Sequence, residues 1–149
     1  MKRIISVLTV LMLLQTAHGA EAEPGSLVKI TDCWIRSMPG SIPSGAYFTV
    51  KNMSDHPVDL ISVRSSAFGM AMLHQTRTMG STSKMVMVDK ATVPAQGTLS
   101  FAPGGYHVML EEPKAHLEIG SSTSLTFEFG EAQEISSPCL IKPAGSVSK

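Results

Sequence analysis

The sequence has few aromatic residues, few charged residues and few cysteines. Phe, Trp and Tyr make up 5% of the 149 residues, charged residues make up 16%, and there are two cysteines. Twelve Lys and Arg balance twelve Asp and Glu, so the chain lacks the basic excess that nucleic-acid-binding proteins normally carry. A chain of this length forms one domain and is short for a doubly wound nucleotide-binding fold or a barrel enzyme. Hydrophobic residues nevertheless reach 43%, enough for a packed core and against disorder.

Long hydrophobic runs are also missing, with one short exception at the start. Ile4–Leu14 is apolar apart from two hydroxyl residues, follows two positive residues and precedes several small ones. Such a run is too short to span a bilayer, which takes about 20 residues, and the pattern is typical of a secretory signal peptide. We therefore expect a signal peptide at 1–19, cleaved after Gly19 or after Ala22. The mature chain is expected to be exported, periplasmic in a Gram-negative bacterium, without membrane insertion.

The rest of the chain consists of short β-rich runs separated by Gly and Pro. Many short strands with regular turn signals indicate an all-β, antiparallel sandwich or barrel. We expect a single β-domain over 23–142 and a flexible tail over 143–149. One of the predicted turns is Pro43-Ser44-Gly45. The expected strands are Val28–Arg36, Ala46–Asn52, Val58–Ser65, Ala71–Thr76, Lys84–Val88, Thr98–Phe101, His107–Leu110, Ser124–Phe129 and Glu134–Ile141.

Methionine is the residue present in excess, with ten copies. Three of the expected strands carry Met or His at alternate positions, and residues two apart in a strand point to the same face. The three pairs are Met72 with His74, Met85 with Met87, and His107 with Met109.

The first two of these pairs are expected to lie on one hairpin that turns near Met79. A register symmetric about that turn places His74 opposite Met85, and Met72 opposite Met87. Opposed Cβ atoms lie about 4.5–5.5 Å apart, close enough for both side chains to reach one ion.

Two imidazoles and two thioethers form a soft donor set, which favours Cu(I) over zinc, magnesium or calcium. The alternative for any single Met in a strand is core packing, and we interpret Met53 and Met70 in that way. Met72 and Met87 remain open between core residues and auxiliary metal ligands.

The spacing His74, ten residues, Met85, twenty-one residues, His107, one residue, Met109 resembles the H-x10-M-x21-H-x-M pattern of the PCu(A)C family of periplasmic copper chaperones. The segments Asp32–Arg36, Ala67–Gly69 and Pro103–His107 are also similar. The resemblance implies a cupredoxin-like Greek-key β-sandwich that binds one Cu(I) per chain through His74, Met85, His107 and Met109. It also implies delivery of copper to the copper centre of cytochrome oxidase, or to another copper chaperone.

Cys33 and Cys139 lie in the first and last expected strands. An exported protein meets an oxidising compartment, where an even number of cysteines favours a disulfide. The alternative is two buried, unpaired thiols. A Cys-x-x-Cys redox motif is absent.

The leading functional hypothesis is a monomeric copper carrier without enzymatic activity. An electron-transfer blue-copper protein would need a Cys ligand beside two His, and neither cysteine lies near His74 or His107 in the sequence. A metal-free exported β-sandwich used for interaction or assembly is the alternative.

Overall fold

The structure, a computed structural model, describes residues 26–147. The predicted signal peptide at 1–19 and its two cleavage sites lie outside this range. Within it the chain forms ten strands and one short 3-10 helix, and none of it forms a helix long and apolar enough to cross a membrane. In chain order the elements are β1 (Val28–Arg36), β2 (Ser44–Asn52), β3 (Val58–Arg64), β4 (Phe68–Met79), β5 (Thr82–Met87), β6 (Ala91–Val93), β7 (Thr98–Phe101), β8 (Tyr106–Pro113), β9 (Ser122–Phe129), η1 (Gly130–Ala132) and β10 (Gln133–Lys142).

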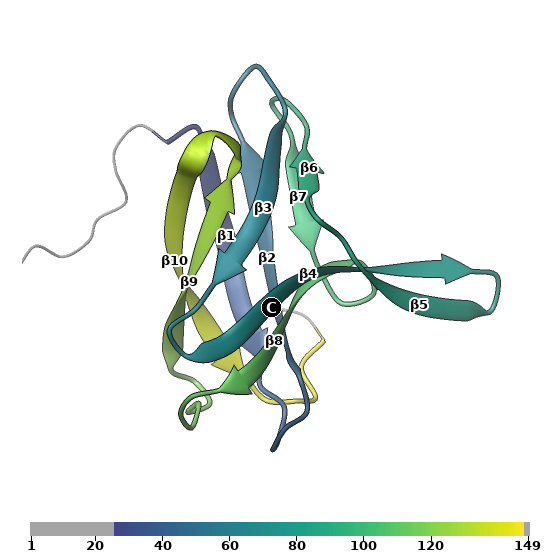
Figure 1. Cartoon of the computed structure of the whole chain (residues 1–149), viewed down its shortest axis with the longest axis vertical. Coiled ribbons are helices and arrows are strands. Elements are labelled where there is room, and N and C mark those ends of the chain that lie inside the picture. Colours follow the sequence, from purple (N-terminus) through teal and green to yellow (C-terminus); the bar gives the residue numbers. More distant parts are fainter. Residues whose placement is uncertain (1–25, 148–149) are drawn as a thin grey trace, which may run out of the picture.

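All ten strands belong to one sheet in the order β5-β4-β8-β7-β2-β1-β10-β9-β3-β6, with a further pairing of β8 with β2. Most neighbours are antiparallel, but β1 pairs with β10, and β7 with β8, in parallel. The sheet folds back on itself, because β3 also contacts β4 although the two strands lie far apart in the pairing order. Figure 1 shows the resulting two-layered body. The prediction of an all-β fold is confirmed.

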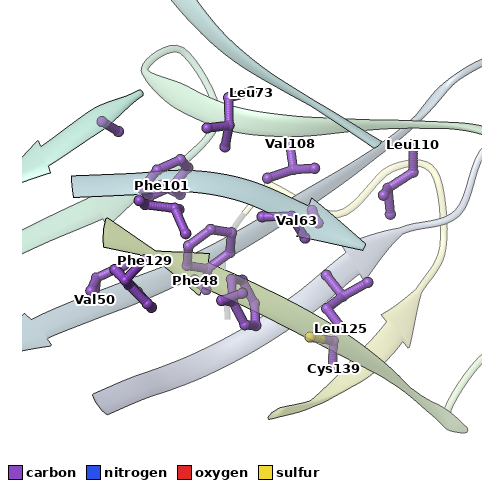
Figure 2. Close-up of a cluster of buried hydrophobic side chains, with 14 of the residues drawn as sticks. Phe48, Val50, Val63, Leu73, Phe101, Val108, Leu110, Leu125, Phe129 and Cys139 are labelled. Atoms are coloured by element: carbon purple, nitrogen blue, oxygen red, sulfur yellow. The ribbon is translucent and has the colours of Figure 1, made fainter. Parts of the chain in front are cut away.

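The core fills the space between the two layers. The Phe48 ring of β2 stacks on Phe101 with ring centroids 4.3 Å apart, and it meets the edge of Phe127 of β9 at 4.6 Å. Leu73 of β4 and Val108 of β8 reach into the same cluster (Figure 2). Burial of a large apolar side chain contributes roughly 1.5–3 kcal/mol, so β4 and β8 are anchored through their inward residues.

The accuracy of the predicted strand boundaries differs from strand to strand. β1 and β7 have the predicted limits. The three-residue strand β6 was not predicted, and the predicted turn at Pro43-Ser44-Gly45 is wrong, because Ser44 and Gly45 already belong to β2 and pair with Leu110 and Met109.

The β4–β5 hairpin projects from the body as an arm (Figure 1). Its outer end closes with Met79 opposite Thr82, so the turn consists of Gly80 and Ser81. Gly80 has a φ of +61°, a left-handed conformation that glycine adopts without steric cost. The turn therefore lies one residue later than the symmetric turn expected from the sequence.

The parallel pairing of β1 with β10 brings the two cysteines together. Trp34 pairs with Leu140, and the preceding residues Cys33 and Cys139 form a disulfide with their Cα atoms 4.5 Å apart. No free cysteine occurs in residues 26–147.

Candidate metal site

The site depends on the alternation of inward and outward side chains along β4 and β8. Leu73 is 5% exposed and pairs with Val108 in the core, so the neighbouring residues on each strand point outward. The register then places His74 opposite His107, and Met72 opposite Met109. The two imidazole rings lie nearly perpendicular, at 88°, with centroids 5.7 Å apart.

The arm adds two methionines to this face, in a register that differs from the expected one. Met87 lies opposite His74, and Met85 lies opposite Thr76. The predicted pairing of His74 with Met85 is wrong, as is that of Met72 with Met87, because moving the turn by one residue moves the pairing by two. A register shift of two residues leaves each side chain on the same face of the sheet. Met85 and Met87 therefore still lie on the face that carries His74.

Six side chains from three adjacent strands thus share one outer face, which we call the sulfur–imidazole face. His107 is 7% exposed, whereas Met85 and Met87 are 57% and 67% exposed. The other three are partly buried. The face therefore has a sheltered imidazole end on β8 and an open thioether end on β5. Its members are Met72, His74, Met85, Met87, His107 and Met109.

His107 is held by the loop that precedes it. Its Nδ1 lies 3.1 Å from the carbonyl oxygen of Gly105, so Nδ1–H donates and Nε2 carries the free lone pair of the neutral ring. The same carbonyl accepts a hydrogen bond from the Thr76 amide of the arm at 3.0 Å. One carbonyl group therefore orients an imidazole and fastens the base of the arm beside it.

His74 has an unsatisfied nitrogen. Among the described residues, its Nδ1 is the buried side-chain polar atom that has no hydrogen-bond partner. Burial lowers the pKa of His74, the nearby His107 lowers it further, and Glu111 acts weakly in the opposite direction. A buried polar atom left without a partner is costly. A neutral imidazole with an unused nitrogen beside a second imidazole and several thioethers fits a soft metal ion.

Harder metal ions lack suitable ligands in the part of the chain that the structure describes. Residues 26–147 contain no group of three or more His, Cys, Asp or Glu side chains placed to hold a metal. Both thiols are consumed in the disulfide, so no thiolate of the blue-copper type is present there. The donors that the sulfur–imidazole face adds to its two imidazoles are thioethers, a soft type of ligand.

The Tyr47 side chain, which was not among the residues predicted for the site, borders the imidazole end of the face. Gly45 lies in register between Arg36 and Met109, and the Tyr47 side chain lies across it. The Tyr47 ring is 6.4 Å from the His107 ring, and its hydroxyl accepts a hydrogen bond from Arg36 at 2.5 Å. The signal available in the sequence was a glycine two residues before an aromatic residue, on the same face of one strand.

The remaining Met and His residues are outside the set of six, although Met70 continues the outer face of β4 two residues before Met72, opposite Glu111. Met70 is 43% exposed and Met53 is partly buried, so the interpretation of Met70 as a core residue is wrong. Met79, at the end of the arm, is 82% exposed. His56 pairs with Asp55 on the surface.

Comparison with protein families identifies relatives. A family described as putative lipoprotein LpqE-like matches residues 28–139. A putative lipoprotein of Leifsonia xyli subsp. xyli is 33% identical over 105 residues, which cover 70% of this chain and 63% of the relative. An uncharacterized protein of Rickettsia prowazekii is 31% identical over 103 residues, covering 66% of this chain and 57% of that protein. The chain thus matches less than two thirds of the length of either relative.

Solved structures show the same fold. The apo PCuAC domain of PmoF2 superposes with a TM-score of 0.70 at 24% identity, covering 83% of this chain and 96% of that one. The copper-bound PCuAC domain from PmoF2 gives 0.67 at 25% identity, covering 79% and 94%. The Cu(I) form of DR1885 from Deinococcus radiodurans gives 0.62 at 31% identity, covering 84% and 83%. The resemblance to the PCu(A)C family and its cupredoxin-like fold is therefore confirmed, and the chain belongs to the LpqE-like family of PCuAC-related proteins.

Proposed function

We propose that this protein binds one Cu(I) ion through His74, Met85, His107 and Met109. The observation that carries the proposal is the unpartnered Nδ1 of His74, which lies beside His107 on a face otherwise occupied by thioethers. Two imidazoles and two thioethers complete a four-coordinate shell for a soft ion. The copper-bound PCuAC domain and the Cu(I) form of DR1885 support the choice of metal.

We further propose that the protein is a metallochaperone, which carries copper and passes it on. The thioether end of the site is open, with Met85 more than half exposed, so a partner's donors can approach the ion directly. A filled four-donor shell has no vacant position for a substrate, which favours a carrier over an enzyme. The acceptor we expect is a copper-centre subunit of cytochrome oxidase or a second copper chaperone.

The proposed location is the periplasm, or more generally the exported fraction. The predicted signal peptide supports export, and one relative is a putative lipoprotein. Thioether ligands suit such a compartment, because they are not lost to disulfide formation. The carrier is expected to act as a monomer.

The test is a competition titration of the mature protein with Cu(I) against a colorimetric Cu(I) chelator under reducing, anaerobic conditions. We expect one tight equivalent per chain and no intense blue band with Cu(II). Transfer is then measured by mixing the loaded protein with an apo copper-centre domain, separating the two proteins and measuring the copper content of each. Absence of tight Cu(I) binding would overturn the proposal and leave the metal-free interaction protein as the explanation of the fold.

A further inference from the structure

We propose that Met85 and Met87 are alternative fourth ligands of one Cu(I) ion, and that the ion exchanges between them. This inference rests on the proposed function, because it concerns the same site. Two ligands that compete for one coordination position would give the site a built-in step of ligand release.

The register of the arm supplies the geometry. Met87 lies directly opposite His74, at a typical Cβ separation of about 4.5–5.5 Å. Met85 lies opposite Thr76, on the diagonal from His74, where Cβ atoms are about 7–8 Å apart. The smaller Thr76 side chain leaves a path along the face for the long thioether of Met85. Both sulfurs can therefore approach an ion bound to His74 from neighbouring positions on β5.

Neither methionine is committed to packing. Met85 and Met87 are 57% and 67% exposed, and β5 is the last strand at its end of the sheet, paired with β4 alone. Methionine has three rotatable side-chain bonds and adapts easily to irregular surroundings. The loss of side-chain conformational entropy is therefore similar whichever of the two methionines binds the ion.

The other three donors are held more firmly. The Gly105 carbonyl orients His107. His74 lies in a central strand pairing, opposite His107 of β8. Met109 lies opposite Gly45, over which the Tyr47 side chain extends. A four-coordinate ion bound by His74, His107 and Met109 has one position left. One methionine of β5 fills that position at a time.

Exchange between the two sulfurs needs no redox step. One thioether withdraws its lone pair from Cu(I), the ion is briefly three-coordinate, and the second thioether or an acceptor's donor fills the position. The oxidation state of copper and the charge of the site stay the same. An acceptor therefore meets an ion that already releases one ligand without losing its imidazoles.

Affinities of four variants test the exchange by a double-mutant cycle. Two equivalent arrangements bind an ion about twice as tightly as either one alone. We expect Met85→Ala and Met87→Ala each to weaken Cu(I) binding by about two- to threefold, and the double variant to weaken it by well over tenfold. Met79→Ala, at a methionine of the same arm that is even more exposed, should bind as the wild type does. Urea melts of the apo proteins verify that each variant is folded.

A spectroscopic measurement accompanies the affinities. In protein labelled with 13C at the methionine methyl groups, one equivalent of Cu(I) should move the signals of both Met85 and Met87, and that of Met79 should stay in place. If either single variant binds as weakly as the double variant, or one of the two methyl signals stays fixed, the exchange is disproved and one methionine is the sole ligand. If the wild type does not bind Cu(I) tightly, the proposed function itself fails, which is a different result.

Discussion

A Cβ atom on Gly45 would lie 2.6 Å from the hydroxyl oxygen of Tyr47 and 3.0 Å from the ring carbon that bears it. Contacts this short force a displacement, so the glycine and the tyrosine depend on each other. The Tyr47 ring occupies the place of the missing side chain between Arg36 and Met109. A residue without a side chain thus shapes the border of the proposed copper site.

Gly45→Ala is expected to push the Tyr47 ring away from His107 and Met109. We expect Cu(I) binding to weaken several-fold and the free energy of unfolding to fall by about 1–3 kcal/mol, as for other overpacked sites. Chelator competition and urea denaturation measure the two effects. Adding Tyr47→Phe removes the closest atom and should restore part of both losses. Gly130→Ala, at a glycine with open space around it, is the matched control.

Ligand and core variants are expected to separate binding from stability. Met109→Ala should weaken Cu(I) binding at least tenfold while the apo protein keeps most of its stability, because the side chain is only partly buried. Phe48→Ala should leave the ligands in place but cost about 3–5 kcal/mol of stability, since Phe48 packs between two other phenylalanines. The same titrations and urea melts apply. A Met109→Ala variant with full affinity would remove Met109 from the ligand set.

The lowered pKa of His74 predicts a pH dependence of apo-protein stability. Above the ordinary value of about 6.5, His74 is neutral in both the folded and the unfolded chain and has no effect. As the pH falls through that value, the unfolded chain takes up a proton that the folded chain does not, so the free energy of unfolding decreases. The decrease ends below the folded pKa, where both states are protonated.

His74→Gln is expected to remove this part of the pH dependence. Urea melts between pH 7.5 and about 5 would then give a flatter profile for the variant than for the wild type. An unchanged slope in His74→Gln would assign the effect to other groups. Because the folded imidazole stays neutral at lower pH, it also remains available to Cu(I) in mildly acidic solution.

The disulfide is expected to stabilise the fold without taking part in copper binding. Cys33 and Cys139 are 106 residues apart in sequence, and closing so long a loop contributes up to ~4–5 kcal/mol in the chain-entropy model. Replacing both residues by Ser should lower the urea midpoint and leave Cu(I) affinity unchanged. Mass spectrometry of the unreduced exported protein should detect the Cys33–Cys139 peptide pair. Full thiol labelling of unreduced, unfolded protein would contradict the bond.

Much of the fold could be predicted because short β-rich runs alternate with segments that contain Gly and Pro. The limits of β1 and β7 follow from the flanking turn signals, and the shared face of His107 and Met109 follows from alternation within one strand. β6 has only three residues, too few for alternation to be recognised. Ser44 and Gly45 look like turn residues, and they belong to β2 because they pair with Leu110 and Met109 of β8, a tertiary contact that local composition does not reveal.

The sequence predicted which residues of the site share a face, but not which of them lie opposite each other on neighbouring strands. Alternation fixes which residues share a side, so Met85, Met87 and His74 were correctly grouped. The partner of His74 depends on where the hairpin turns, and a shift of the turn by one residue exchanged Met85 for Met87. The pairing of β4 with β8, which brings His74 and His107 together, joins segments that are distant in sequence and left no local signal.

The disulfide also determines what happens when the arm is cut. Arg77 and Lys84 are exposed on the projecting hairpin, where a protease such as trypsin can reach the backbone, and both lie between Cys33 and Cys139. A single cut there would leave two fragments joined by the covalent bond and by the paired strands of the body. On a gel the nicked protein would migrate as one species until a reducing agent separated the pieces. Limited digestion can therefore sever the hairpin connection between His74 and Met87 while the two-layered body stays assembled.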